Sequence, residues 1–396
     1  MSGPLAGLRV LDFGRFIAAP YCAMVLGDLG AEVLRVERPG GEEDRRLGLE
    51  AANGETFTFA ALARGKKGIT LDLHRGGDAA RAVLGDLVRW ADVLIHNFGP
   101  EAAAALGLTY DEVRAHRPDI VYAAVSCYGP GGGTGFDQMA QMTSGAGMLS
   151  GLESQPPLRA GVPWADYSTG LAATVGVLAA LRHRDATGEG QSVDCALLQT
   201  AVSFTAPMVA EAVVAGTPRP RLGNQGAHLG PSNLYPCRDG HVYVSAITSG
   251  TWRALASTIG RPDLAAEPEL RTASGRFAHR ERVDAAITAW SERRTAREAL
   301  AELAAARVPS GPQRGLAEVP EDERVRAGGM LPHVDLGVDG LARVPVSATP
   351  VRLSRSPASC PSTRPPRPGE HNDEVYGAEL GYAGARLSEL RATGVI

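Results

Sequence analysis

The first third of the chain alternates strand-like and helix-like segments, and this alternation constrains the fold more than any other feature. Residues 8–13 predict a short buried strand, residues 21–29 predict a helix that ends at Gly30, and residues 31–37 predict a second strand. A strand, a helix and a strand within about thirty residues form a βαβ unit, which implies a parallel sheet. The pattern recurs, with strands expected at residues 68–73, 92–95 and 119–126 and helices at residues 77–90 and from Thr109. We therefore expect an α/β fold with a doubly wound sheet.

The composition shifts after the middle of the chain. Residues 216–231 are rich in Gly, Pro and Arg and are typical of a linker between domains. Beyond them a hairpin and several helices predict a smaller α+β domain, and the Pro-rich residues 332–368 predict an extended segment that lies over a surface. The predicted division is a large domain at residues 1–215, a small domain at 216–328, and a return segment with a last helix at 329–396.

The composition excludes several classes of partner. The chain has 396 residues, 44% of them hydrophobic and 21% charged, which suits a globular protein of two domains. The net charge of −4 gives no basic excess, so we expect no nucleic acid and no acidic membrane surface as partner. The N-terminus has no signal-peptide pattern, and no apolar run is expected to reach the ~18 residues typical of a membrane span. These features indicate a cytoplasmic protein.

The sequence has no motif for a bound metal or a bound phosphate. The turn after the first expected strand has Gly14 alone rather than G-x-G-x-x-G, and residues 64–68 lack the pattern of a phosphate loop. Neither H-E-x-x-H nor G-x-S-x-G occurs. The cysteines have no C-x-x-C pair, which disfavours a disulfide framework or a zinc site: Cys22, Cys127, Cys195, Cys237 and Cys360. We expect no metal and no tightly bound cofactor.

Asp166 precedes a long apolar run and has two interpretations. A carboxylate just before a helix, with Ser168 and Thr169 beside it, is well placed to cap the free N–H groups of the first turn. A carboxylate can also attack an acyl carbonyl and form a covalent intermediate. The residue alone does not decide between a cap and a nucleophile.

Several stretches of the sequence resemble motifs of the family III CoA-transferases, and they follow one another in the same order as in that family. The resemblance covers essentially the whole chain, and its motifs are residues 8–20, 29–33 with 36–41, 92–100, 118–129, 136–137 with 141, 166–170, 187–191, 259–264 and 369–375. The family includes formyl-CoA transferase, L-carnitine CoA-transferase and the 2-methylacyl-CoA racemases. The resemblance implies a large Rossmann-like domain, a small domain, C-terminal residues that return to the large one, and an interlocked homodimer.

The resemblance also implies a reaction. The catalytic Asp of the family falls on Asp166, so the expected enzyme moves CoA from an acyl-CoA donor to a free carboxylic acid. The acyl-CoA thioester and the carboxylic acid would be its substrates. Asp166 would form a mixed anhydride with the acyl group and then an aspartyl-CoA thioester, without metal or ATP.

Further site residues follow from the resemblance one at a time. Arg38 matches the basic contact to the CoA phosphates, and Asn97 and Phe98 match CoA contacts at a strand end. Arg15 and Phe16 lie where the family places residues close to the reacting carbonyl, so we expect them to bind substrate.

The sequence departs from formyl-CoA transferase at several of these positions. Ile17 stands where that enzyme has Gln and Phe136 where it has Tyr, so Phe136 predicts a less polar acyl pocket and disfavours an oxalate-like substrate. Ala105 replaces a CoA-contacting Arg, and only Ser249-Gly250 corresponds to a glycine-rich active-site loop. The donor and acceptor acids are not identified by the sequence, although Arg15 and Arg159 are each able to bind a carboxylate.

Two alternatives remain. A 2-methylacyl-CoA racemase needs acid/base groups on both faces of the carbon beside the thioester, and the racemases use a His in a Gly-His-Asp motif. That motif reads Gly135-Phe136-Asp137 here, and Phe136 cannot carry a proton, which disfavours racemisation. A non-catalytic CoA-binding protein is expected to have lost the nucleophile, whereas Asp166 is present.

Overall fold

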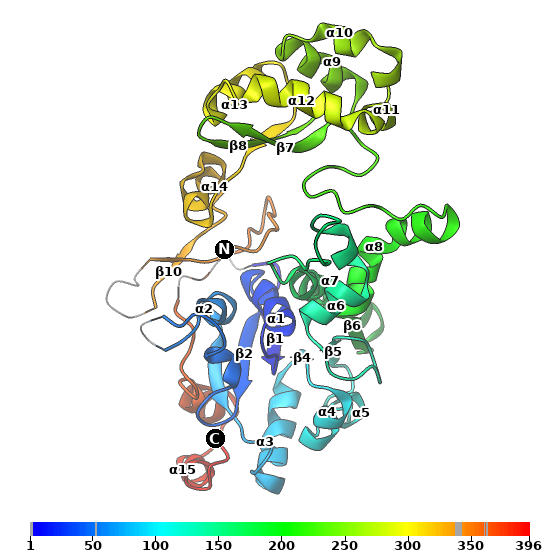
Figure 1. Ribbon diagram of the computed structural model, residues 1–396. Coiled ribbons are helices and arrows are strands. Elements are labelled where there is room, and N and C mark those ends of the chain that lie inside the picture. The colour runs from blue at the N-terminus through cyan, green and yellow to red at the C-terminus, as the bar shows by residue number, and fades with distance from the viewer. Residues whose placement is uncertain (1–2, 52–53, 337–342, 360, 362) are drawn as a thin grey trace. The chain divides into compact units, whose positions relative to one another are not determined.

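The computed structural model of the protein describes residues 3–51, 54–336, 343–359, 361 and 363–396 (Figure 1). Cys360 lies outside these described residues. The chain groups into two compact units, each described by itself below. The large unit consists of the described residues of Met1–Ser144, Gly161–Phe204 and Glu323–Ile396, and the small unit consists of Gly145–Ala160 and Thr205–Asp322. The division into domains at 1–215, 216–328 and 329–396 stays a prediction.

A parallel sheet forms the centre of the large unit. Among the described residues its strand order is β3-β2-β1-β4-β5-β6, and every pairing between neighbours is parallel. The strands are β1 (Arg9–Asp12), β2 (Glu32–Glu37), β3 (Lys67–Thr70), β4 (Val93–His96), β5 (Val121–Ser126) and β6 (Ser192–Ala196). The order reverses between β1 and β4, and ligands of such sheets bind beyond the carboxyl ends of the strands at this reversal. The predicted α/β fold with a large parallel sheet is confirmed.

Both faces of this sheet are buried. Successive strand residues point to opposite faces, so Val10 and Val93 join one hydrophobic cluster while Leu11 and Leu94 join another. The first cluster contains residues of α1 (Ala18–Asp28) and α7 (Trp164–Thr187), and the second contains residues of α3 (Gly77–Trp90) and of the C-terminal residues 375–396. Strands buried on both faces read as nearly continuous apolar runs, which is why the sequence shows them clearly.

Short helices complete the large unit. The helix expected from Thr109 is present and begins with a capping box, in which the Thr109 hydroxyl accepts from the N–H of Glu112 and the Glu112 carboxylate accepts from the N–H of Thr109. The other elements among the described residues of this unit are a 3₁₀ turn (Glu43–Arg45), α2 (Phe57–Ala63), α4 (Pro100–Leu106), α5 (Tyr110–His116), α6 (Asp137–Thr143), α14 (Glu323–Ala327), β10 (His333–Val334), β11 (Val344–Pro345), a π-helical turn (Asp373–Glu379) and α15 (Gly384–Ala392).

The C-terminal residues pack on the edge strand β3. The Tyr376 hydroxyl donates to the backbone oxygen of Thr70 at 2.8 Å, and the Asn372 amide donates to the Thr70 hydroxyl at 2.8 Å. Further on, the N–H of Asp72 donates to the backbone oxygen of Val395 at 2.8 Å. Residues separated by some three hundred positions therefore share one core.

The small unit is a helical layer on a short antiparallel sheet. Its strands are β7 (Ser232–Cys237), β8 (Gly240–Ser245) and β9 (Ser310–Pro312), in the order β7-β8-β9. The hairpin of β7 and β8 is the one expected beyond residue 231, and Asp239 and Gly240 lie at its turn. Trp252, Leu255 and Ile287 are among the residues of its own core. Its helices are α9 (Ser249–Thr258), α10 (Pro262–Ala266), α11 (Ala273–Ala278), α12 (Arg280–Ser291) and α13 (Ala296–Ala305).

Helix α8 (Leu197–Val214) differs from the prediction that no apolar run reaches the length of a membrane span. It has 18 residues with a mean hydropathy of 1.4, and by length and composition alone it is able to cross a membrane. A single helix of this kind is weak evidence for a membrane protein. Glu211, near its C-terminal end, forms an ion pair with Arg219 at 2.6 Å, which favours water over lipid at that end.

Candidate active site

Asp166 lies in the first turn of α7, which begins two residues earlier at Trp164. The cap of this helix comes from another segment of the chain. The Asp137 carboxylate accepts from the backbone N–H groups of Ala165 at 2.9 Å and of Asp166 at 3.2 Å. The interpretation of Asp166 as the helix cap is therefore wrong. Asp137 accepts hydrogen bonds from the free N–H groups of the first turn, so the Asp166 carboxylate is not needed for that role.

Two features raise the pKa of Asp166. Burial disfavours its charged form, and the negative charge of Asp137 adds to this effect, so the pKa is raised to about 7. Asp137 is itself buried, and the Gln141 amide donates to its second oxygen at 2.6 Å. A poorly hydrated carboxylate that is partly ionised at neutral pH suits a nucleophile better than a surface anion does.

The loop after β1 carries Arg15 and Phe16 at the reversal of strand order. Phe16 adopts a left-handed backbone with φ of +64°, which is uncommon for a residue other than glycine. Its ring meets that of Phe136 edge to face, with the ring centres 5.8 Å apart. Because Phe136 directly precedes Asp137, the Phe16 ring stands next to the segment that caps the helix of Asp166. The structure thus brings the two predicted aromatic residues together, and half of the Phe136 surface is exposed.

Arg15 joins this loop to the end of β4. The N–H of Arg15 donates to the Asn97 side-chain oxygen at 2.8 Å, and the Asn97 amide donates back to the Arg15 backbone oxygen at 2.8 Å. The Arg15 guanidinium also lies over the Phe98 ring, 4.9 Å from its centre. Three of the predicted binding residues therefore form one cluster.

Arg38 reaches the same cluster through Glu42. The Glu42 carboxylate pairs with Arg15 at 3.1 Å and with Arg38 at 3.9 Å, and the Arg38 Nε donates to the Gly41 backbone oxygen at 3.1 Å. The side chain of Arg38 is 54% exposed, so the guanidinium is accessible to an anionic ligand such as a phosphate. The carboxyl ends of β1, β2 and β4 thus present Arg15, Arg38, Asn97 and Phe98 on neighbouring loops.

Possible metal ligands and the buried histidine at the end of β4 are both candidate parts of the site. Within the described residues no group of three or more His, Cys, Asp or Glu side chains is placed to hold a metal ion. His96 is buried at the end of β4, where burial lowers its pKa to about 4 and its Nε2 lies 2.5 Å from the Tyr122 hydroxyl. A neutral, buried ring of this kind suits a structural histidine.

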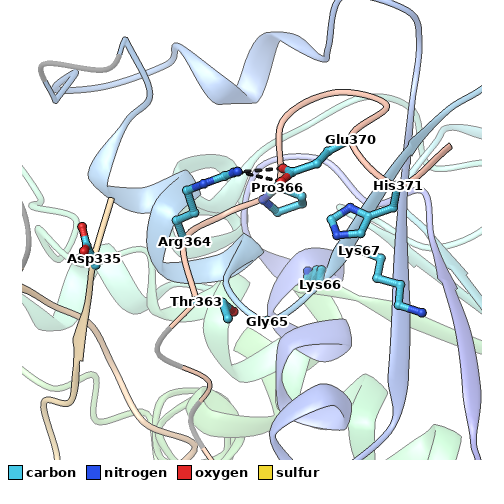
Figure 2. A pocket seen from close by; sticks show the side chains of 9 residues that line it. All are labelled: Gly65, Lys66, Lys67, Asp335, Thr363, Arg364, Pro366, Glu370 and His371. Carbon is cyan, nitrogen blue, oxygen red and sulfur yellow. Dashed lines mark hydrogen bonds and ion pairs between the residues drawn. The ribbon is translucent and has the colours of Figure 1, made fainter. Parts of the chain in front are cut away.

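A cavity elsewhere in the large unit is less suited to CoA. Its volume is about 580 Å³, and Figure 2 shows Arg364, Lys67 and His371 among the side chains that line it. Arg364 is paired with Glu370 at 2.6 Å, and Lys67 is paired with Glu374 at 2.8 Å and Glu379 at 2.9 Å. Cations that are already neutralised offer little attraction to phosphates.

Sequence reasoning missed the roles of Asp137, Glu42 and Asp44. Asp137 belongs to the Gly135-Phe136-Asp137 motif, but its function as a cap depends on contact with a helix about thirty positions away. The Asp44 carboxylate accepts from the N–H of Phe16 at 3.1 Å, and no local sequence pattern predicts that contact.

Comparison with known proteins identifies similar chains. The family model described as CoA-transferase family III matches residues 5–372. A succinyl-CoA:mesaconate CoA-transferase of Haloarcula marismortui is 34% identical over 387 residues, covering 94% of this chain and 96% of the relative. A formyl-CoA:oxalate CoA-transferase of Streptomyces avermitilis is 33% identical over 419 residues and covers 100% of both chains. The crystal structure of a CAIB/BAIF family protein from Brucella suis has a TM-score of 0.83 at 31% identity, covering 96% of this chain and 100% of that one.

Proposed function

The chain belongs to CoA-transferase family III, and from this premise we propose that it moves CoA from an acyl-CoA donor to a free carboxylic acid through Asp166. The observation that carries the proposal is the state of that carboxylate. Asp166 is largely buried, has a pKa raised to about 7 by burial and by Asp137, and is not used as a helix cap. An enzyme of this family needs a nucleophile that acts without metal or ATP, and this carboxylate meets that need.

The proposed reaction consists of two successive acyl exchanges at the Asp166 carboxylate. Asp166 attacks the donor thioester carbonyl, the C–S bond breaks, and CoA thiolate leaves a mixed anhydride behind. The thiolate attacks the Asp166 acyl carbon, which releases the donor acid and forms an aspartyl-CoA thioester. The acceptor carboxylate then attacks that thioester, and the released thiolate attacks the acceptor acyl carbon of the second anhydride. The products are the acceptor acyl-CoA and the free Asp166 carboxylate.

The neighbouring residues have separate proposed roles. Arg38 attracts the CoA phosphates, and Asn97 and Phe98 contact CoA beyond the end of β4. Arg15 binds substrate close to the reacting carbonyl. The cluster of these four residues around Glu42 supports one continuous binding surface. The rings of Phe16 and Phe136 contact the acyl group.

Racemisation of a 2-methylacyl-CoA is the less favoured alternative. It requires a second acid/base group opposite Asp166. Phe136 occupies the position of the racemase His, and the buried His96 has a pKa lowered to about 4 and a ring nitrogen beside Tyr122. The relatives reported above are named CoA-transferases, which further supports transfer.

One incubation separates the alternatives. Purified protein is mixed in heavy water with succinyl-CoA, acetyl-CoA, 2-methylacyl-CoA and a pool of free carboxylic acids, and the CoA esters are analysed by mass spectrometry beside an Asp166→Ala control. We expect new acyl-CoA species that are missing from the control. Deuterium beside the thioester of 2-methylacyl-CoA without new CoA esters would instead identify a racemase. No turnover of any donor would favour a CoA-binding protein without activity.

A further inference from the structure

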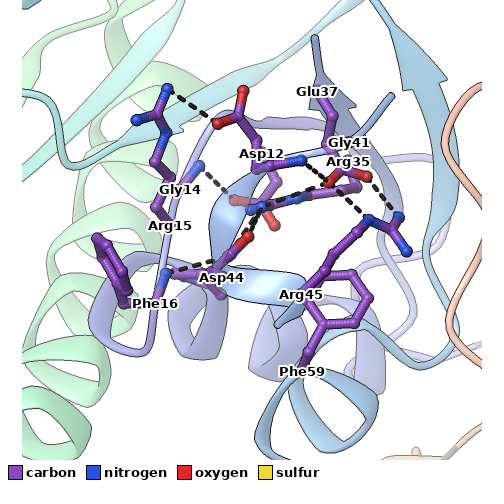
Figure 3. Close-up of polar contacts among 12 residues, drawn as sticks. Asp12, Gly14, Arg15, Phe16, Arg35, Glu37, Gly41, Asp44, Arg45 and Phe59 are labelled. Carbon is purple, nitrogen blue, oxygen red and sulfur yellow. Dashed lines mark hydrogen bonds and ion pairs between the residues drawn. The ribbon is translucent and has the colours of Figure 1, made fainter. Parts of the chain in front are cut away.

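A buried network of ion pairs lies directly behind the loop that carries Arg15 and Phe16 (Figure 3). The Arg35 guanidinium donates to both oxygens of Asp44, at 2.9 and 3.1 Å, and Arg45 donates to Glu37 at 2.6 Å. All four side chains are buried, in β2 and in the 3₁₀ turn Glu43–Arg45. Burial raises the pKa of the Asp44 carboxyl even though Arg35 attracts its charged form. A buried ion pair often contributes little net stability, so its presence here calls for another explanation.

The network fixes the backbone of the loop at successive positions. The Asp12 carboxylate accepts from the N–H of Gly14 at 2.8 Å, and the Asp44 carboxylate accepts from the N–H of Phe16 at 3.1 Å. Between them, the N–H of Arg15 donates to Asn97. Asp12 is in turn held by Lys66 at 2.7 Å. Three consecutive backbone N–H groups of this loop therefore donate hydrogen bonds to side chains.

Phe16 is the residue that needs this support most. Its left-handed backbone is unfavourable for a side chain larger than glycine and persists only where the surroundings enforce it. The hydrogen bond to Asp44 acts on the N–H of Phe16 itself, and the edge-to-face contact with Phe136 depends on the resulting direction of the ring. A change at Asp44 would therefore reach the acyl side of the site although Asp44 touches no substrate.

We propose that Asp44, oriented by Arg35, is a positioning residue that holds Phe16 in its left-handed conformation so that the Phe16 and Phe136 rings orient the acyl group at Asp166. This inference rests on the proposed function of the site. Reactions between positioned groups lose rate steeply when the geometry is displaced by even an ångström. The buried pair thus contributes orientation rather than chemistry.

The chain offers a matched control for this proposal. Asp28 is also buried in the large unit and pairs through both oxygens with Arg64, at 2.6 and 2.8 Å. Its carboxylate also accepts from the Thr349 hydroxyl at 2.6 Å, so it supports α1 and the C-terminal segment rather than the loop of Phe16. Asp28→Ala removes a buried carboxylate of comparable surroundings, and it therefore reports the general cost of breaking such a pair.

The experiment compares Asp44→Ala, Asp44→Asn and Asp28→Ala in protein labelled with 4-fluorophenylalanine. The Phe16 signal in the ¹⁹F spectrum is assigned with Phe16→Leu. Exchange of labelled succinate into succinyl-CoA gives kcat and KM, free CoA gives the dissociation constant by calorimetry, and thermal melting reports folding. Asp44→Asn has the size of the native residue and keeps one acceptor oxygen, so it serves where Asp44→Ala does not fold.

We expect Asp44→Ala to shift or broaden the Phe16 signal and to lower kcat by about 10- to 100-fold. The dissociation constant of CoA should change by less than about threefold, because the CoA contacts of Arg38 and Phe98 do not involve Asp44. Asp44→Asn should lie between the Ala variant and the native protein. Asp28→Ala should lower the melting temperature while leaving the Phe16 signal and kcat near their native values.

Two results would overturn the proposal. One is an unchanged Phe16 signal in both Asp44 variants, and the other is an equal loss of kcat in Asp28→Ala and Asp44→Ala. If the native protein exchanges no succinate, the failure belongs to the donor or to the proposed function. The ¹⁹F comparison still decides whether Asp44 positions Phe16.

Discussion

The protonation state of a single carboxylate, Asp166, sets the conditions under which the site is able to react. Attack on a thioester requires the ionised form, and burial together with Asp137 raises the pKa of Asp166 to about 7. We therefore predict that kcat/KM rises tenfold per pH unit below about 7 and levels off above it. Steady-state exchange between pH 5 and 8.5 measures this profile.

A substitution at Asp137 tests the origin of that pKa. Asp137→Asn removes the negative charge but keeps an oxygen that is able to accept from the N–H groups of Ala165 and Asp166. We predict that the acidic limb of the profile moves to lower pH, because the carboxylate of Asp166 then ionises without a neighbouring anion. A limb that stays in place would assign the shift to burial alone.

The same carboxylate should weaken the folded state at alkaline pH. Its pKa is higher in the folded chain than in the unfolded one, so between about pH 4 and pH 7 the folded state binds a proton that the unfolded state has lost. Stability from this group therefore falls as the pH rises through that window. We predict that Asp166→Asn gains up to about 3 kcal/mol more over the native protein at pH 8 than at pH 5. Urea unfolding at both pH values measures the difference, and an equal effect at both would contradict it.

At the scale of elements, α1 and α7 approach so closely that glycine is needed between them. A Cβ on Gly170 of α7 would lie 2.6 Å from the backbone oxygen of Ala18 in α1 and 3.1 Å from the Tyr21 ring. Backbone does not yield cheaply, so we predict that Gly170→Ala destabilises the protein by about 1–3 kcal/mol. Thermal melting and urea unfolding measure the loss.

A helix in the small unit provides the control for that substitution. Gly250 of α9 has open space where a Cβ would stand, with the Thr248 hydroxyl oxygen 4.0 Å away. Gly250→Ala should be neutral or stabilising by about 0.5–1 kcal/mol, because alanine has the higher helix propensity. Equal effects of the two substitutions would mean that the contact between α1 and α7 relaxes freely.

Elements defined by local patterns were predicted well, and those that depend on distant partners were not. The apolar strands of the large sheet and helix α3 (Gly77–Trp90) lie where periodicity placed them, because burial on both faces leaves a clear local signal. Helix α7 begins at Trp164 and therefore includes Asp166, which the sequence placed just before the helix, since its cap is Asp137 and lies in another segment. The left-handed Phe16 is likewise invisible to local patterns, because its support comes from Asp44.

The candidate site divides in the same way. Arg38, Asn97 and Asp166 could be named from the sequence because each lies in a motif that resembles the family. The contacts between the site residues could not be predicted, because Glu42 links Arg15 to Arg38 only after β1 and β2 have paired in the sheet. Networks of charged side chains behind a site form through tertiary contacts. Reactive residues are therefore easier to predict from a sequence than the residues that position them.

At the scale of the whole molecule, α8 carries large apolar side chains that are exposed. Val213 is 77% exposed and Val209 is 47% exposed, and because they are four positions apart in the helix they share one side of it, which we call the α8 apolar face. Exposed apolar surface of this kind is typical of a protein–protein contact. We propose that the protein is a homodimer in which the α8 apolar face is buried between the two copies.

Light scattering after size-exclusion chromatography tests this proposal. The native protein should have twice the mass of the chain, and Val213→Glu should shift it toward the monomer because a buried, unpaired carboxylate is costly. Leu316→Glu is the matched control, since Leu316 is 93% exposed but lies outside α8, and it should leave the mass of the dimer unchanged. A native monomer, or a Val213→Glu variant that stays dimeric, would remove the α8 apolar face as the interface. A loss of activity that follows the loss of dimer across protein concentrations would show that the site works only in the pair.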